Sequence, residues 1–337
     1  MLTSENIDQL FENFSHLNVL VIGDVMVDAY IWGQVDRICP EAPVPIVMVK
    51  ERENRLGGAA NVGLNLKALG ANPILCSVIG ADQKGNEFKQ LVQDAGMSLD
   101  GLISDAGRIT TTKFRIIGNQ HQMLRVDEET TEPLNQHQFD LLNDRILSLF
   151  QENEIHVVVF QDYDKGVISP RLINSVVTEA HNRKIPVAVD PKKRNFLDYK
   201  KVTLFKPNLK EVKEGLGVNF DPRNNEQLEM VIAQLQDKLQ AKMVLNTLSE
   251  LGVFISWETK GVYESRLIRA HRRNITDVSG AGDTVISVAA LCLALDAEPG
   301  LMAAIANLAG GLVCEEVGVV PVNKDKLREE VAKMMTS

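Results

Sequence analysis

Short apolar runs recur along the chain, at intervals that leave room for a helix between them. The first, Val19–Ile22, is continuously apolar and stops at Gly23-Asp24. Runs of the same kind follow at Ile74–Ile79, Val157–Phe160, Pro186–Asp190, Val202–Phe205 and Met243–Asn246. A short apolar run bounded by turn residues is typical of a strand buried on both faces, and helix-length spacing favours βαβ units. We therefore expect an α/β fold with three layers, α/β/α, around a mostly parallel central sheet.

Two segments, Tyr30–Lys50 and Thr110–Val126, do not follow this alternation. Both are rich in β-branched residues, alternate in part, and carry no helix of their own. They predict a small β-sheet that projects from the main body. Open α/β sheets bind ligands at the carboxyl ends of their strands, so such a lid would close over a site there and exclude water. With no long linker or internal repeat, residues 1–337 are predicted to form a single domain with lid segments at about 30–50 and 110–126.

Composition excludes several classes of partner. The 337 residues are 45% hydrophobic, which is enough to bury a large core, and the formal net charge is -9. Lys and Arg are scattered among acidic residues, so we expect no nucleic-acid partner. No apolar stretch reaches the roughly 20 residues that span a bilayer, and the N-terminus shows no export signal, so we expect no membrane partner and a cytoplasmic protein. The four cysteines lie far apart without metal-ligand spacing.

The strongest local signal is the segment Asp277–Thr284, of sequence DVSGAGDT, which precedes the apolar run Val285–Leu295. Small residues let a ligand approach the backbone, and N–H groups at a helix start stabilise developing phosphate charge. This pattern predicts an anion hole at Gly280, Ala281 and Gly282. Asp283 is then placed to accept the proton of an attacking hydroxyl. An ordinary glycine turn before a helix, with Asp283 as a first-turn acid, fits the same residues.

A second glycine motif, Gly57-Gly58-Ala59-Ala60-Asn61, opens another helical segment. Paired glycines expose backbone donors, and an Asn side chain offers both a donor and an acceptor, which suits a polyhydroxylated ligand. Asp24 and Asp28 follow the first strand, where carboxylates can accept bonds from sugar hydroxyls or serve only to form a turn.

A weaker motif, Leu204–Glu211, runs from a strand into a helix. Asn208 and Glu211 lie three residues apart and so face the same side. The same spacing describes an N-cap with a capping-box acid.

Taken together and in this order, GGAAN, the Asn208–Glu211 segment and GAGD resemble the ribokinase-like (PfkB) carbohydrate kinases, from about Val19 to Val320. A narrower similarity is to the heptose 7-phosphate kinases of bacterial ADP-heptose synthesis. It is carried by the segments Gly23–Asp28, Arg37–Pro45, Arg125–Asp127, Asp162–Gly166 and Asp190–Lys192, of which PEAPVP (Pro40–Pro45) is the most specific.

The resemblance implies a ribokinase-like fold, Mg²⁺ with ATP, and phosphorylation of the anomeric hydroxyl of D-glycero-D-manno-heptose 7-phosphate. Asp283 becomes the catalytic base and the three residues before it the anion hole. The residues implied to bind ATP are Asn208, Glu211, Thr247, Gly252 and Asn307, with Glu211 meeting the metal through water. The residues implied to bind the substrate are Asp24, Asp28, Gly57, Gly58, Asn61, Lys113, Arg125 and Lys192, of which Lys113 and Arg125 are candidates for the distal phosphate.

Several further expectations follow from the resemblance. A monovalent cation requirement is left open, and relatives pair their lids, which implies a homodimer. Ser249 and Leu251 depart from the family's pattern beside the expected nucleotide site. Bifunctional relatives add a nucleotidyltransferase domain with a His-x-Gly-His motif, and none of the six His residues here forms one, so we expect kinase activity only and adenylyl transfer by a separate protein.

Two alternatives accompany this interpretation. The first is a kinase of the same family for another sugar, sugar phosphate or nucleoside, against which PEAPVP argues. The second is a nucleotide-binding regulator that has lost catalysis, against which the retained Asp283, glycines and Glu211 argue.

Overall fold

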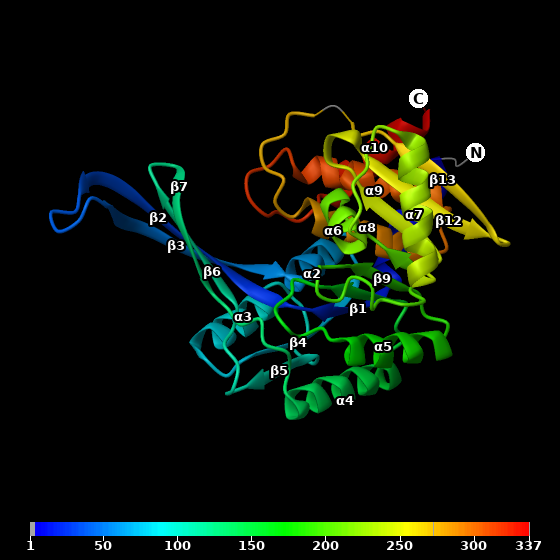
Figure 1. Cartoon of the computed structure of the whole chain (residues 1–337). Coiled ribbons are helices and arrows are strands. Elements are labelled where there is room, and N and C mark those ends of the chain that lie inside the picture. The colour runs from blue at the N-terminus through cyan, green and yellow to red at the C-terminus, as the bar shows by residue number, and fades with distance from the viewer. Residues whose placement is uncertain (1–3, 272, 337) are drawn as a thin grey trace.

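A large central sheet covered by helices forms the body of the molecule, and a smaller sheet projects from it (Figure 1). The computed structural model describes residues 4–271 and 273–336. In this part of the chain the large sheet has nine strands. In spatial order they are β13 (Val262–Ile268), β12 (Val253–Thr259), β11 (Met243–Thr247), β10 (Leu204–Phe205), β9 (Val187–Asp190), β8 (Val157–Gln161), β1 (Asn18–Gly23), β4 (Asn72–Gly80) and β5 (Leu102–Asp105).

The strands from β11 to β5 are parallel, whereas β12 and β13 pair antiparallel at one edge. Strand β1 lies between β8 and β4 and is buried on both faces, as its unbroken apolar sequence predicts. Val19 and Val21 pack into one core, and Leu20 and Ile22 pack into another on the opposite face. The alternation of side chains along β1 therefore divides the interior into two layers.

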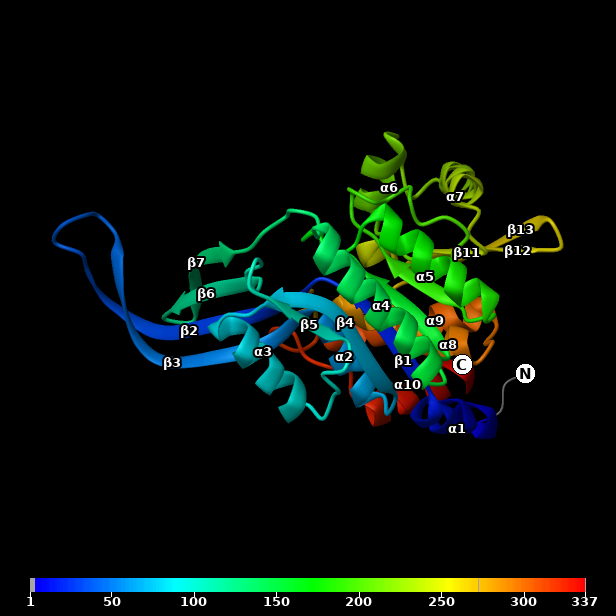
Figure 2. The same ribbon diagram turned by 90° about the horizontal axis from the view of Figure 1, so that it is seen from below.

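Helices cover both faces of the sheet (Figure 2). Buried residues of helices on one face join the core of Val19: α1 (Ser4–Asn13), α2 (Ala59–Ala68), α3 (Gln83–Asp94), α8 (Ala281–Ala294), α9 (Pro299–Val313) and α10 (Lys324–Thr336). Those on the other face join the core of Leu20: α4 (Gln136–Glu152), α5 (Pro170–Asn182), α6 (Leu209–Leu216) and α7 (Asn225–Leu239). Short 3₁₀ turns lie at Phe14–His16 (η1) and Ser249–Leu251 (η2).

Helix α8 is almost entirely buried, which explains why its sequence is apolar all round. Among the described residues, no helix combines the length and apolar character that crossing a membrane requires.

The smaller sheet is the predicted lid. It orders four strands as β3 (Pro45–Gly58), β2 (Val25–Ile38), β6 (Thr112–Gly118) and β7 (His121–Glu128). Strand β2 leaves the carboxyl end of β1 after one residue, Asp24, and the lid extends away from the body (Figure 1). The expected three-layer fold with a separate small sheet is confirmed, although the lid strands extend beyond both predicted segments. Asp28, which was predicted to follow the first strand and either bind sugar hydroxyls or form a turn, lies within β2.

The two faces of the lid differ in chemistry. Directly opposed residues of neighbouring strands share a face, and so do residues two apart along one strand. Asp28 lies opposite Lys113, which lies opposite Asp127, so one face is charged. The adjacent rows, Ile31–Ile116–Leu124 and Ala29–Phe114–Val126, make the other face apolar.

Candidate active site

The carboxyl ends of β1, β8, β9 and β10 meet the N-terminus of α8, and the side chains there form one connected polar network. Asp283, in the first turn of α8, is at its centre. Its carboxylate accepts hydrogen bonds from Asn61 Nδ2 at 2.6 Å, Tyr163 Oη at 2.8 Å and Gln161 Nε2 at 3.1 Å. The glycine motif at the start of α2 and the motif before α8 are thus in contact across 222 residues of sequence.

Burial sets the basicity of Asp283, which is 7% exposed. Burial raises the pKa of Asp283 to about 6, opposed by the hydrogen bonds from Asn61 and Tyr163 and assisted by the negative charge of Asp190. A carboxylate with this pKa is ionised at neutral pH and is a better proton acceptor than an exposed Asp.

The glycine turn before Asp283 provides donors for an anion. Gly280 has φ of +80°, a left-handed conformation that favours glycine, and no side chain caps α8. A Cβ built on Gly282 would lie 3.7 Å from Lys206 Nζ and 3.8 Å from Asp190 Oδ2. The first turn of α8 therefore combines a helix N-terminus with a nearby lysine, an arrangement that favours a phosphate group.

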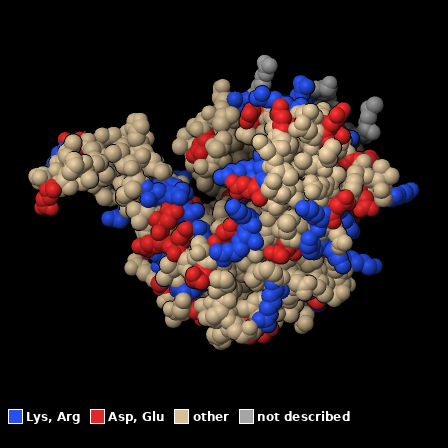
Figure 3. Space-filling view, in the orientation of Figure 1, with Lys and Arg blue, Asp and Glu red and all other residues tan. Residues whose placement is uncertain are grey.

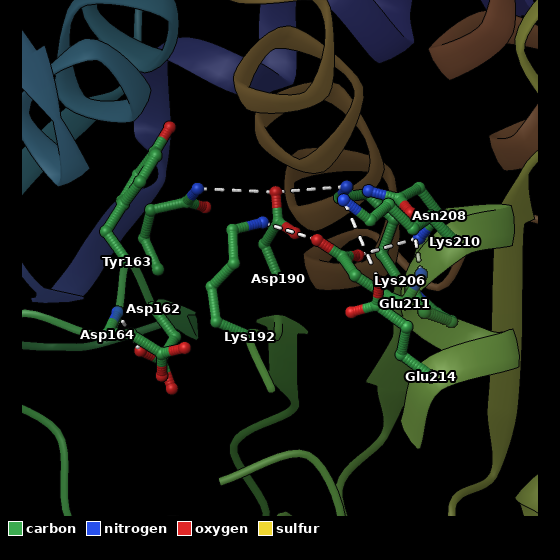
Figure 4. A network of polar contacts seen from close by, with 12 residues as sticks. Asp162, Tyr163, Asp164, Asp190, Lys192, Lys206, Asn208, Lys210, Glu211 and Glu214 are labelled. Atoms are coloured by element: carbon green, nitrogen blue, oxygen red, sulfur yellow. Dashed lines mark hydrogen bonds and ion pairs between the residues drawn. The ribbon is translucent and has the colours of Figure 1, made fainter. Parts of the chain in front are cut away.

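Two ion pairs lie next to this turn (Figure 4). Lys206 Nζ contacts Asp190 Oδ2 at 3.0 Å, and both side chains are buried. Gln161 Nε2 lies 3.3 Å from the same Asp190 oxygen, so it connects this pair to Asp283. Asp190 and Lys206 were not among the predicted site residues, because an apolar strand followed by Asp or Lys is too common a pattern to identify them.

The second ion pair joins Lys192 to Glu211. Asn208 and Glu211 form the capping box that their spacing permits, with Asn208 N donating to Glu211 Oε2 at 2.8 Å. Lys192 also lies 5.7 Å from the ring centroid of Tyr163, between the Glu211 helix and the Asp283 network. The structure therefore places Lys192, a predicted substrate contact, beside the predicted nucleotide residue Glu211.

Asp24 has a structural role in place of the predicted sugar contact. Its carboxylate is 1% exposed and accepts from the backbone N–H groups of Tyr163 at 2.9 Å, Lys165 at 3.0 Å and Val167 at 3.0 Å. Burial raises the pKa of Asp24, opposed by these three backbone bonds. Asp24 thus holds the loop that presents Tyr163 to Asp283, and its carboxylate faces the protein interior.

Asp28 and the paired glycines lie together at the start of the lid. Asp28 Oδ1 contacts Arg115 Nη1 of β6 at 2.5 Å. A Cβ on Gly57 would lie 2.5 Å from Asp28 Oδ2, and one on Gly58, whose φ is +61°, would lie 2.3 Å from the carbonyl oxygen of Asp24. The close approach of neighbouring atoms explains why both positions are glycine. Arg115, which pairs with the predicted site residue Asp28, was not among the predicted site residues, because nothing in its strand sequence sets it apart from other charged residues.

The two predicted phosphate contacts on the lid differ. Lys113 is partly buried on β6. Arg125 is 51% exposed and makes two hydrogen bonds, at 2.9 and 3.0 Å, to Asp127 of its own strand. Of these two residues, Arg125 is paired, whereas the side chain of Lys113 makes no ion pair with any described residue.

The remaining predicted nucleotide residues lie around α6 and α9. Thr247 at the end of β11 forms a parallel bridge with Asn208. Gly252 ends the η2 turn, and Asn307 of α9 donates to the backbone oxygen of Arg269 at 2.9 Å. Thr247 thus joins the Asn208 region, whereas contacts of Gly252 and Asn307 with a nucleotide stay predictions.

Buried acceptors without partners show where a ligand would donate. Among the described residues, Asn61 Oδ1 and Gln161 Oε1 are buried without a hydrogen-bond partner, although both amides donate to Asp283. Unsatisfied buried acceptors carry a free-energy cost that a ligand hydroxyl would relieve. Two acceptors beside a basic carboxylate are suited to a polyol with adjacent hydroxyl groups.

Comparison with known proteins shows the family of this chain. The pfkB family carbohydrate kinases match residues 16–326. The chain belongs to this family. Members of the PfkB family are carbohydrate kinases, and this chain is therefore an ATP-dependent carbohydrate kinase.

A curated relative and two solved structures agree with this family. The bifunctional protein HldE of Desulfatibacillum aliphaticivorans is 37% identical over 321 residues, which cover 94% of this chain and 64% of that protein. Phosphofructokinase-2 from Escherichia coli in complex with potassium has a TM-score of 0.75 at 16% identity, over 95% of this chain and 99% of that one. Arabidopsis thaliana ribokinase complexed with ribose and ATP has a TM-score of 0.70 at 16% identity, over 94% and 98%. These structures establish a ribokinase-like fold.

Proposed function

We propose that this PfkB kinase transfers the γ-phosphate of ATP to the anomeric hydroxyl of D-glycero-D-manno-heptose 7-phosphate, giving the 1,7-bisphosphate used for ADP-heptose and the lipopolysaccharide core. The observation that carries the kinase reaction is the basic, buried Asp283 at the N-terminus of α8, flanked by unsatisfied acceptors. The choice of sugar is supported by the PEAPVP segment and by the similarity to HldE proteins.

The geometry suggests how the residues divide the reaction. Asp283 accepts the proton of the attacking hydroxyl, and the sugar oxygen forms a bond to the γ-phosphorus while the bond to the ADP oxygen breaks. Asn61 and Gln161 accept bonds from neighbouring hydroxyls through their unpaired oxygens. The α8 N-terminus and Lys206 stabilise charge on the transferring group.

The residues present suit Mg²⁺ that arrives with the nucleotide. Mg²⁺ keeps several waters and is usually bound through substrate phosphates and one or two carboxylates. In the described part of the chain no three His, Cys, Asp or Glu side chains form a metal cluster. Asp190 lies beside Gly282 of the anion hole, and Figure 4 shows Glu211 near Asp190 with Lys192 between them. Both are paired with lysines, so we propose that they contact the metal through water, where the ion would neutralise phosphate charge.

One assay tests the proposed function. ADP release should be measured against heptose 7-phosphate, fructose phosphates, ribose and adenosine, with and without K⁺, since a structural neighbour was solved with potassium. We expect the highest kcat/KM for heptose 7-phosphate. A higher kcat/KM for another sugar or a nucleoside would indicate a PfkB kinase with a different substrate. ATP binding without turnover of any acceptor would favour a nucleotide-binding regulator.

The assembly and compartment are also proposals. We propose that the chain forms a homodimer through the apolar face of the lid, because Leu124 and Val126 are exposed there. We also propose that the protein acts in the cytoplasm, because its reaction consumes ATP, which is supplied there. The match spans 64% of the length of the HldE relative, and the proposed function concerns the kinase reaction.

A further inference from the structure

A lysine without a partner lies at the base of the lid, on its charged face. Lys113 of β6 lies between Asp28 and Asp127 in the strand register, yet among the described residues its Nζ makes no hydrogen bond and no ion pair within 4.0 Å. Burial lowers the pKa of Lys113, and the positive charge of Lys165 lowers it further. Partial burial of an unpaired ammonium group beside a second one is unfavourable unless an anion binds there.

The second lysine belongs to the loop that also presents Tyr163. Lys165 N donates to Asp24, and its carbonyl oxygen accepts from the guanidinium group of Arg108. A Cβ on Gly166 would lie 2.0 Å from the backbone oxygen of Glu132, so this loop packs directly against the segment that follows β7. The backbone of Lys165 is therefore fixed at both ends, next to the base of the lid and two residues from a contact of Asp283.

Glu129 neutralises Lys165 only in part. Lys165 Nζ lies 2.6 Å from Glu129 Oε1, whereas Glu129 Oε2 is buried without a hydrogen-bond partner in the described structure. Asp28 and Asp127 also lie near Lys113, but they pair with Arg115 and Arg125. Among the described residues Glu129 is therefore the carboxylate that pairs with one of the two lysines, and it is itself incompletely satisfied. A phosphate dianion would match both lysines better, because it supplies a second charge and further acceptor oxygens.

We infer that Lys113 and Lys165 bind the distal phosphate of the sugar substrate, and that Glu129 occupies Lys165 as an internal counter-ion until that phosphate arrives. The inference rests on the proposed sugar kinase function and adds a specificity site at the base of the lid. Figure 3 shows Lys and Arg beside Asp and Glu where the lid meets the body. In this scheme the substrate phosphate replaces Glu129 as the partner of Lys165. An unphosphorylated sugar has no anionic group that could do so, and the enzyme therefore prefers the phosphorylated sugar.

The test compares a sugar phosphate with the same sugar lacking its phosphate, in Lys165→Met and Lys113→Met. Removing one charge-assisted contact should lower kcat/KM for the phosphorylated sugar by about tenfold to a hundredfold. The KM for ATP and the kcat/KM for the unphosphorylated sugar should stay at the wild-type values. Lys165→Arg should recover part of the preference. Lys238→Met removes the same charge from the exposed end of α7 and serves as the matched control.

Glu129→Gln tests the counter-ion separately. Calorimetric titration of the sugar phosphate without ATP should show tighter binding than in the wild type, because the competing carboxylate is neutral. Weaker binding in Glu129→Gln would contradict the role of Glu129 as a counter-ion that the phosphate displaces.

The outcomes separate this inference from the proposed substrate. If heptose 7-phosphate is inactive while another sugar phosphate is preferred over its parent sugar, the proposed substrate fails and the lysine variants are tested with that sugar. If both lysine variants keep the wild-type preference, or if they raise only the KM for ATP, the phosphate site is wrong and the kinase function stands.

Discussion

Asp283 is stabilised as a carboxylate by three donors from two parts of the chain. Asn61 comes from α2, and Gln161 and Tyr163 come from the end of β8. Burial opposes ionisation while these bonds favour it, and the balance leaves the pKa of Asp283 at about 6. The side chain is consequently both ionised and appreciably basic at the pH of a cell.

We predict that Asp283→Asn retains the fold and ATP binding but lowers kcat by about two orders of magnitude or more, the scale of losing a positioned general base. The amide is nearly isosteric but cannot accept a proton. Steady-state ADP release, circular dichroism and equilibrium ATP binding provide the measurements. A folded variant with near-normal kcat would remove Asp283 from the base role.

The pH dependence should follow the ionisation of Asp283. The base must be deprotonated, so kcat is predicted to fall as pH drops below about 6. The Tyr163 bond lowers the pKa of Asp283, so Tyr163→Phe should move this acid limb to higher pH and reduce kcat by roughly tenfold, the scale of one hydrogen bond to a charged group.

A second buried carboxylate requires a control for this measurement. Burial also raises the pKa of Asp162 to about 6, and its Oδ2 accepts from Tyr199 Oη at 2.7 Å. Tyr199→Phe removes a buried phenol from Asp162 and leaves the Tyr163 bond intact. An acid limb that moves in Tyr199→Phe and not in Tyr163→Phe would assign the titration to Asp162.

Individual side chains were predictable where a motif restricted them. The GAGD turn combines small residues with an acid, so the sequence predicted the start of α8 and the place of Asp283 in its first turn, while the role of Asp283 as base stays a prediction. Gln161, Asp190 and Lys206 follow apolar strands without distinctive spacing, and only the strand order brings them together. For Asp24 the sequence predicted the position after the first strand. It did not predict that the carboxylate accepts from backbone N–H groups such as that of Tyr163.

At the level of elements, the sequence predicted the buried parallel strands well and the edges poorly. Continuous apolar runs marked β1, β4, β8, β9, β10 and β11. Strand β5 has three partly buried residues and one exposed residue, and β13 is largely exposed, so neither shows the apolar pattern of a central strand. The two-sided burial that makes a strand recognisable is absent at the edges of a sheet.

The loop from Asp162 to Val167 is the element on which the site's geometry depends. We predict that Asp24→Asn destabilises the protein by about 1–3 kcal/mol, because one buried backbone N–H then faces an amide donor in place of a carboxylate oxygen. The same change should lower kcat/KM for the sugar more than the KM for ATP changes, since the loop carries Tyr163 and Lys165. Urea unfolding and two-substrate kinetics provide the measurements.

Asp144→Asn on the exposed side of α4 provides a matched control for Asp24→Asn, with unchanged stability and kinetics expected. Equal stability of Asp24→Asn and the wild type would show that the three backbone bonds do not depend on the carboxylate.

At the scale of the whole molecule, the two faces of the lid differ in chemistry, and we propose a separate function for each. The charged face carries Asp28, Arg115 and Lys113, and Arg115 pairs with Asp28. The apolar face carries Leu124 and Val126, which are exposed in the single chain. A projecting sheet with an exposed apolar face invites pairing with a like surface, and twofold symmetry would bury both copies at once.

The last prediction is that Leu124→Glu and Val126→Glu convert a dimer into monomers, because a carboxylate at the interface would face its symmetry mate or be buried unpaired. Sedimentation equilibrium at several concentrations measures the mass directly. Met230→Glu introduces the same charge at an exposed apolar position on α7 and should leave the dimer intact. If the wild type is monomeric, or if both lid variants remain dimeric, the lid does not mediate assembly. If monomers form and the KM for the sugar rises while that for ATP holds, dimerisation also stabilises the charged face over the substrate, since both faces belong to the same four strands.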